Sequence, residues 1–142
     1  MVVSIGAIGS ASGAAEYYAA DNYYVGEQAA EHQGEWGGEA AARLGLSGGV
    51  DPSQFENCLK GHLPNGATIA NNAGDHRPGL DLTFSAPKSV SLLALLGKDE
   101  RIAPAHVSAV KATLAWVEQR LAEARVSGEG PRAVQTGNLA YA

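Results

Sequence analysis

The chain has 142 residues and a mass of 14.6 kDa, the length of one ordinary globular domain. Its formal net charge of −5 argues against unspecific nucleic-acid binding, which depends on Lys and Arg side chains that neutralise phosphates. No stretch approaches the roughly 18 apolar residues of a membrane-spanning helix, and no basic region opens the N-terminus as in a signal peptide. We therefore expect a cytoplasmic protein without a membrane span. The single cysteine, Cys58, excludes an internal disulfide and a Cys-based zinc site.

Charge is distributed unevenly along the sequence. Residues 1–75 carry two basic and nine acidic side chains, whereas residues 76–142 carry eight basic and six acidic ones. The second half is therefore slightly basic, and it is the half that could face DNA.

Short-range patterns predict the first elements. Residues 2–8 form a β-branched run that ends in a cluster of Gly and Ser, typical of a strand followed by a turn. We expect an alanine-rich helix over residues 14–24, capped by Ser12. A polar loop and a short helix over residues 39–44 follow.

The next helix has a well-defined start. Asp51 is a good N-cap residue, Pro52 suits the first helical position, and Gln54 completes a capping box, so we expect a helix through Leu59. The residues from there to Arg77 have the composition of turns and a polar loop.

Residues 80–85 alternate between apolar and polar side chains, the period of a strand with one buried face. Asp81 and Thr83 should project from the other face. Ser85 and Pro87 should then start a helix over residues 88–96.

Apolar residues at spacings of three and four predict a long amphipathic helix over residues 104–125. A turn and a final strand over residues 132–142 follow. This order, with helix stripes that need one apolar sheet face, predicts a two-layer α+β domain whose other sheet face is available for a ligand.

Four of the five tyrosines stand close together, as the pairs Tyr17 with Tyr18 and Tyr23 with Tyr24. A tyrosine hydroxyl can act as the nucleophile that forms a phosphotyrosine in DNA strand transfer. Because the reference pKa is near 10, ionising the hydroxyl at pH 7 costs about 4 kcal/mol, so a base, a metal ion or both must assist. The alternative, favoured by periodicity alone, is that these rings pack the helix against the sheet.

Other polar residues also have two interpretations. Asp81 on the open sheet face can accept a proton or orient a metal-bound imidazole, or it can be a solvated strand residue. Lys88 in the first turn of its helix can join backbone N–H groups in holding a phosphate, or simply be exposed. The histidines lack metal-ligand spacing and are expected to be structural or solvated; they are His32, His62, His76 and His106.

Residues 77–92 read RPGLDLTFSAPKSVSL, which resembles the signature of TrwC-type (MobF class) conjugative relaxases almost residue for residue. The resemblance continues through the paired tyrosines, through Trp36 and the two glycines after it, and through Phe55. It extends to the Thr-Gly-Asn-Leu segment at residues 136–139 and so covers nearly the whole chain.

The resemblance implies a single partial relaxase domain over residues 1–142. Its fold would be an antiparallel sheet backed by helices on one face, the palm of relaxases and rolling-circle initiators, incomplete at its C-terminus. The implied activity is metal-dependent nicking and strand transfer at a plasmid transfer origin during conjugation, through a 5′-phosphotyrosine intermediate.

By position in the family, Tyr17 is the initiating nucleophile and Tyr23 serves a later transfer or termination step, with Tyr18 and Tyr24 as secondary candidates. Asp81 matches the active-site aspartate. The DNA-contacting candidates are Arg77, Thr83 and Lys88.

Family members bind one divalent cation, Mg²⁺ or similar, through three histidines that include a His-x-His motif. This sequence stops before that motif, so the resemblance assigns no metal ligand to it and implies little or no nicking by the chain alone. The implied partners are single-stranded or hairpin DNA of a transfer origin, other relaxosome proteins and a coupling protein. Two alternatives remain: a catalytically inactive remnant that binds single-stranded or hairpin DNA, and an incompletely folded fragment.

Overall fold

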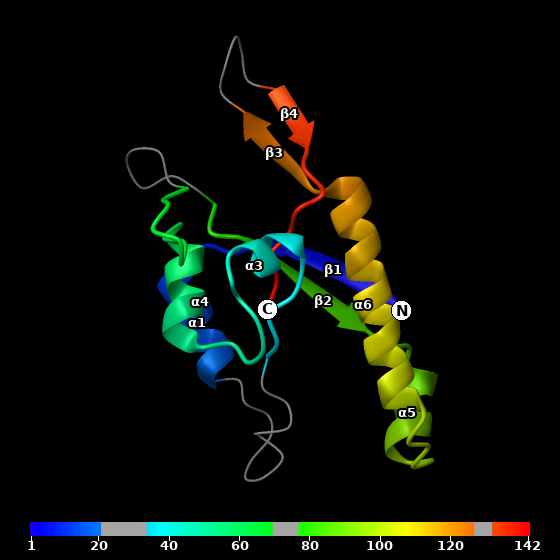
Figure 1. Cartoon of the computed structure of the whole chain (residues 1–142). Helices are drawn as coiled ribbons and strands as arrows, with labels where there is room; N and C mark the ends of the chain where they lie inside the picture. Colours follow the sequence, from blue (N-terminus) through cyan, green and yellow to red (C-terminus); the bar gives the residue numbers. More distant parts are fainter. Residues whose placement is uncertain (21–33, 70–76, 127–131) are drawn as a thin grey trace. The chain divides into compact units, whose positions relative to one another are not determined.

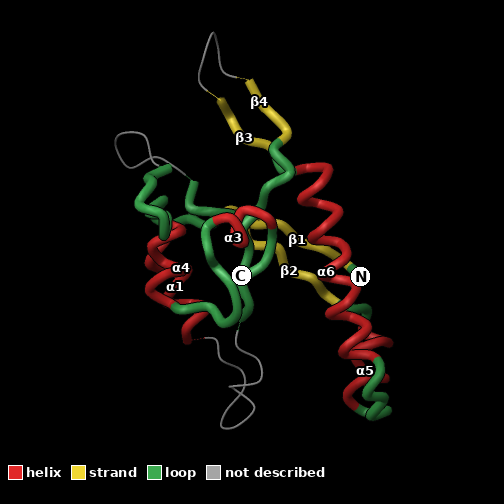
Figure 2. Tube along the Cα trace, viewed as in Figure 1, coloured by secondary structure: helices red, strands yellow, loops and turns green. Residues whose placement is uncertain are grey.

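The structure is a computed structural model that describes residues 1–20, 34–69, 77–126 and 132–142 (Figure 1). It contains runs of helices and short antiparallel strand pairs, as expected of an α+β protein (Figure 2). In chain order the elements are β1 (Val2–Ala7), α1 (Ala11–Ala20), α3 (Glu39–Arg43), α4 (Pro52–Leu59), β2 (Leu80–Ser85), α5 (Lys88–Leu95), α6 (Ile102–Leu121), β3 (Glu123–Val126) and β4 (Arg132–Gln135).

The chain forms two compact units. The first, called the α1–α4 unit, comprises Gly6–Leu80 and Leu139–Ala142. The second, called the α5–α6 unit, comprises Met1–Ile5 and Asp81–Asn138. No helix in the described parts of the chain is long and apolar enough to cross a membrane.

In the α1–α4 unit, α1 and α4 lie side by side (Figures 1 and 2). The predicted start of α4 is confirmed, because a side-chain oxygen of Asp51 accepts the backbone N–H of Gln54 at 2.8 Å and Pro52 is the first helical residue. Leu59, at the predicted end, is buried together with Ala41 and Leu46. These three side chains form the core of the unit.

The predicted start of the first helix, residue 14, is wrong: the helix begins three residues earlier. α1 begins at Ala11, and the hydroxyl of Ser10, not of Ser12, accepts a backbone N–H, that of Gly13, at 3.1 Å. Within the described residues α1 extends to Ala20. Both serines satisfy the preference for a short polar cap, so the local pattern could not select between them.

The C-terminal residues of the chain pair with the start of α3. Gly37 and Tyr141 form an antiparallel bridge, in which each N–H donates to the other's carbonyl at 2.8 and 3.0 Å. The N–H of Ala40 donates to the carbonyl of Leu139 at 2.9 Å. The predicted strand over residues 132–142 is therefore too long: it ends at Gln135, and the last residues pair elsewhere.

β1 and β2 pair in a two-stranded sheet. The N–H of Ile8 donates to the carbonyl of Gly79 at 3.1 Å, so the end of β1 lies beside the start of β2 and the strands run antiparallel. The bounds predicted for β2 are confirmed, but its apolar face is not uniformly buried. Leu80 is 52 % exposed, whereas Leu82 and Phe84 are half-buried.

The long helix α6 ends at Leu121 and not at Arg125 as predicted. Residues 123–126 form β3, which pairs antiparallel with β4 (Figure 1). Ala122, between α6 and β3, is buried. Its carbonyl accepts two hydrogen bonds from Thr136, one from the backbone N–H at 2.8 Å and one from the side-chain hydroxyl at 3.2 Å. Strand pairing within the β3–β4 hairpin thus overrides local helix propensity.

The apolar stripes of α5 and α6 are only partly covered. Val90, Val110, Leu114 and Val117 are half-buried, as the stripe predicts. Leu93 is 55 % exposed, Leu96 just after α5 is 77 % exposed, and Leu121 at the end of α6 is 58 % exposed.

Candidate active site

The first tyrosine pair lies near the end of α1. Tyr17 is 59 % exposed and Tyr18 is 45 % exposed. Their ring centroids are 5.2 Å apart with an interplanar angle of 81°, an edge-to-face contact. The helix thus presents the Tyr17 ring at the surface of the described residues. Tyr23 and Tyr24 lie outside the described residues.

The second ring of the pair is also part of the packing between helices. The Tyr18 ring meets Phe55 of α4 edge to face, at 6.1 Å and 81°. Phe55 in turn contacts Trp36, at 6.1 Å and 54°. The packing interpretation therefore describes Tyr18, but its partner is a helix and not a sheet. No periodic pattern of the sequence joins Trp36, Phe55 and Tyr18, because they stand on three separate segments.

Asp81 and Thr83 are neighbours on β2. The Thr83 hydroxyl donates to Oδ2 of Asp81 at 3.5 Å, the outer limit of a hydrogen bond. Asp81 is half-buried and Thr83 is exposed. Alternation along a strand brings the two together, as predicted. Both belong to the α5–α6 unit, whereas Tyr17 belongs to the α1–α4 unit.

The two basic candidates are exposed. Lys88 is the first residue of α5 and follows Pro87, which is the N-cap in place of the expected Ser85. The first N–H groups of a helix carry partial positive charge, which adds to that of the ammonium group. Arg77 precedes β2 in the α1–α4 unit.

The described residues do not fit a divalent cation site. They contain no group of three or more His, Cys, Asp or Glu side chains that could hold a metal ion. Asp81 and Thr83 together offer a carboxylate and a hydroxyl, well short of the six or so oxygen ligands that Mg²⁺ takes. His62 is exposed and His106 half-buried, while His32 and His76 lie outside the described residues.

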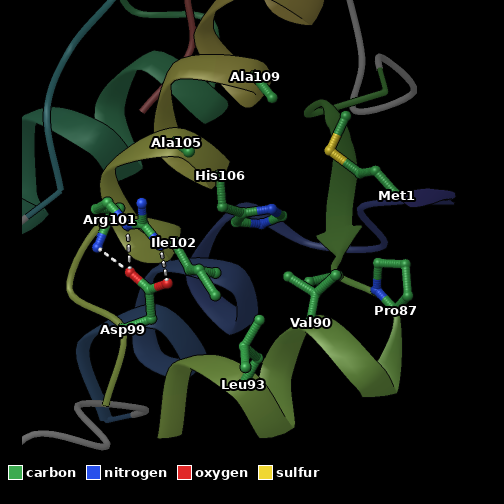
Figure 3. Close-up of a pocket in the computed structure, with 11 residues that line it drawn as sticks. Met1, Pro87, Val90, Leu93, Asp99, Arg101, Ile102, Ala105, His106 and Ala109 are labelled. Carbon is green, nitrogen blue, oxygen red and sulfur yellow. Dashed lines mark hydrogen bonds and ion pairs between the residues drawn. The ribbon is translucent and has the colours of Figure 1, made fainter. Parts of the chain in front are cut away.

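A cavity of about 560 Å³ lies in the α5–α6 unit, between the start of α5 and the first turns of α6 (Figure 3). Its lining is mostly apolar, with His106 pointing into it. At its edge Arg101 donates to both carboxylate oxygens of Asp99, from Nε at 2.9 Å and from Nη2 at 2.7 Å. These side-chain bonds, followed by the backbone N–H of Arg101, hold the pKa of Asp99 below its ordinary value. None of the tyrosine, aspartate or basic candidates lines this cavity.

Solved conjugative relaxases share this fold. A metal-bound structure of the relaxase TrwC in complex with oriT DNA matches with a TM-score of 0.78 and 41 % identity, over 98 % of this chain and 48 % of that one. TrwC with a 27-mer DNA that comprises the recognition hairpin and the cleavage site matches with a TM-score of 0.76 and 39 % identity, over 98 % and 47 %.

Sequence comparison agrees with the fold. The TrwC relaxase family model matches residues 11–142. The multifunctional conjugation protein TraI of Escherichia coli K12 is 45 % identical over an alignment of 146 positions, which covers 99 % of this chain and 8 % of TraI. The chain belongs to the TrwC relaxase family. It spans about half the length of the solved TrwC chains and less than a tenth of TraI.

Proposed function

We propose that the chain carries the nucleophile part of a conjugative DNA relaxase, which nicks one strand at a plasmid transfer origin and passes it on through a 5′-phosphotyrosine. The observation that carries the proposal is the exposed Tyr17 ring on α1, inside the segment that matches the relaxase family. Relatives of the same fold are solved with oriT DNA, which supports DNA as the partner.

In the proposed reaction the Tyr17 oxygen attacks the scissile phosphorus. An O–P bond forms to the 5′ side, the bond to the 3′ oxygen breaks, and the leaving 3′ hydroxyl takes up a proton. One phosphodiester replaces another, so a free 3′ hydroxyl can reverse the step. Ionising the phenol at pH 7 costs about 4 kcal/mol. We assign the acceptance or relay of its proton to Asp81. Tyr23 serves the later transfer, with Tyr18 and Tyr24 as secondary candidates.

The basic candidates bind the DNA backbone in this proposal. Lys88 combines an ammonium group with the N-terminus of α5, and both attract a phosphate. Arg77 and Thr83, both exposed, add a guanidinium and a hydroxyl. Relaxosome proteins and a coupling protein are the further partners that we infer from the family.

We also propose that residues 1–142 are one part of a larger relaxase domain. Exposed apolar side chains at the end of α5 support this, since Leu95 and Leu96 are each 77 % exposed and a packed core would cover them. The coverage of about half of the solved TrwC chains points the same way.

The cation belongs to the remainder of that domain. TrwC has been solved in metal-bound and copper-bound forms. A bound cation contributes several kcal/mol of charge stabilisation in phosphoryl chemistry. Since the described residues do not fit such a site, we expect little or no nicking by this chain alone.

The test is formation of a denaturation-resistant protein–DNA adduct with a single-stranded oligonucleotide library and a divalent cation. We expect an adduct when the chain is mixed with a polypeptide that spans the remainder of the TrwC relaxase domain, and its loss in Tyr17→Phe. Tyr141→Phe, which removes a hydroxyl from the other end of the chain, is the matched control and should keep the adduct. An adduct that survives Tyr17→Phe contradicts the proposal. Salt-sensitive binding with no adduct in any mixture favours a DNA-binding module instead.

A further inference from the structure

We infer that Phe55 is a positioning residue for Tyr17 and acts through the ring of Tyr18. The inference rests on the proposed role of Tyr17 as nucleophile. It concerns a row of four rings, called the aromatic column here, which comprises Tyr17, Tyr18, Phe55 and Trp36 and lies entirely within the α1–α4 unit.

The column has an exposed end and a covered end. Exposure falls from 59 % at Tyr17 to 45 % at Tyr18, and Phe55 and Trp36 are half-buried. Both contacts of Tyr18 are edge to face at 81°, with centroid distances of 5.2 Å to Tyr17 and 6.1 Å to Phe55. These values lie in the range in which the positive edge of one ring attracts the negative face of another. The Tyr18 ring therefore joins the surface tyrosine to the helix beneath it.

The backbone fixes the covered end of the column. The N–H of Trp36 donates to the carbonyl of Gly48 at 3.0 Å, and the N–H of Val50 donates to that of Gly34 at 2.9 Å. Phe55 stands in the first turns of α4, which the Asp51 cap secures, and its own N–H donates to the Asp51 carbonyl at 2.9 Å. Two segments distant in sequence thus hold the Phe55 ring in place.

Fixing Tyr18 also fixes Tyr17, because the two are consecutive on one helix. Any rotation of α1 that repacks Tyr18 carries the Tyr17 hydroxyl with it. Attack on a phosphorus needs the nucleophile in line at close range, and a misplacement of about 1 Å can cost a factor of about 100 in rate. The ring of Phe55 sets that placement from a distance, through its contact with the ring of Tyr18.

The first experiment observes the column without DNA. The tyrosine rings of the full chain are labelled with ¹³C, and Tyr17→Phe assigns the Tyr17 resonances. We expect the ring current of Tyr18 to displace the chemical shifts of the Tyr17 ring protons. This displacement should disappear in Phe55→Leu and in Tyr18→Leu. Phe84→Leu is the matched control, since Phe84 is half-buried on β2 in the other unit. Far-UV circular dichroism identifies any variant that fails to fold. A Tyr17 shift that is unchanged in Phe55→Leu overturns the inference.

The second experiment measures the rate of adduct formation with the oligonucleotide that the wild-type chain selects. The polypeptide that spans the remainder of the TrwC relaxase domain is present in each reaction. We expect Phe55→Leu to lower the rate about 10- to 100-fold, with the affinity for the oligonucleotide unchanged. Phe55→Tyr, which keeps a ring, should recover most of the rate that Phe55→Leu loses. A rate in Phe55→Leu equal to that in Phe84→Leu overturns the inference. An adduct that survives Tyr17→Phe refutes the proposed function instead, and the ring shifts still decide whether the column holds Tyr17.

Discussion

Gly38 is the position at which a single methyl group should have a large effect on folding. It is the N-cap of α3, with φ 94° and ψ 159°, a conformation that is essentially restricted to glycine and costs about 1–3 kcal/mol for other residues. A Cβ at Gly38 would also overlap the carbonyl oxygen of Leu139. That oxygen accepts the N–H of Ala40 at 2.9 Å, beside the two hydrogen bonds between Gly37 and Tyr141. Losing one or two such bonds adds about 1 kcal/mol each, so Gly38→Ala should destabilise the α1–α4 unit by roughly 2–5 kcal/mol.

Gly45→Ala is the matched control. Gly45 also has a positive φ, 74°, but a Cβ there meets open space, so this variant should lose only about 1 kcal/mol. In thermal unfolding followed by circular dichroism, we expect the melting temperature to fall by about 10 °C for Gly38→Ala and by about 3 °C for Gly45→Ala. Hydrogen exchange at the Tyr141 amide should accelerate in the first variant only. Equal melting temperatures, or an unchanged exchange rate at the Tyr141 amide in Gly38→Ala, would refute the proposed role of the close approach between Gly38 and the Leu139 carbonyl.

Three further predictions concern single side chains. Asp51→Ala removes the cap of α4 and should cost about 1 kcal/mol in thermal unfolding, whereas Asp51→Asn, which keeps an acceptor oxygen, should recover most of it. Burial raises the pKa of the Cys58 thiol above its ordinary 9.0, so the unfolded chain ionises first as pH rises and stability should fall above about pH 9. Urea unfolding across that range should show the slope in the wild-type chain and not in Cys58→Ala. Lys88→Gln should weaken oligonucleotide binding, and the slope of log affinity against log salt concentration should fall by about the equivalent of one phosphate contact. An unchanged slope would show that Lys88 is not part of the DNA interface.

Sequence patterns located those elements whose signals are local. The bounds of α4 followed from Asp51, Pro52 and Gln54, and each of these residues has its predicted place in the helix. The bounds of β2 followed from strict alternation. Both depend on interactions between residues a few positions apart, which a sequence pattern contains in full.

The predictions that failed depend on backbone pairing, which side-chain periodicity does not contain. Residues 123–126 continue a helical pattern, but they pair with β4 in a local hairpin, and the Ala122 carbonyl accepts hydrogen bonds from Thr136. The expected last strand ends early because Leu139 and Tyr141 bond to the start of α3, about 100 positions earlier in the chain. In both cases backbone groups find partners that the pattern of apolar residues does not identify.

Within the candidate site, strand alternation predicted that Asp81 and Thr83 lie together, and they do. The edge-to-face contact of the Tyr17 and Tyr18 rings was not predicted, because consecutive residues on a helix do not face each other. The contact between Tyr18 and Phe55 could not be predicted, because it depends on how α1 packs against α4.

An apolar stripe on a helix indicates that the helix has an apolar partner, but it does not identify that partner. The half-buried Val90 and Val110 belong to the same stripes as Leu93 and Leu121, which are 55 % and 58 % exposed. At about 25 cal/mol for each Å² of apolar surface removed from water, covering such a leucine contributes about 1 kcal/mol or more. These exposed leucines therefore gain that stabilisation only when a further surface covers them. This agrees with the proposal that residues 1–142 are one part of a larger relaxase domain.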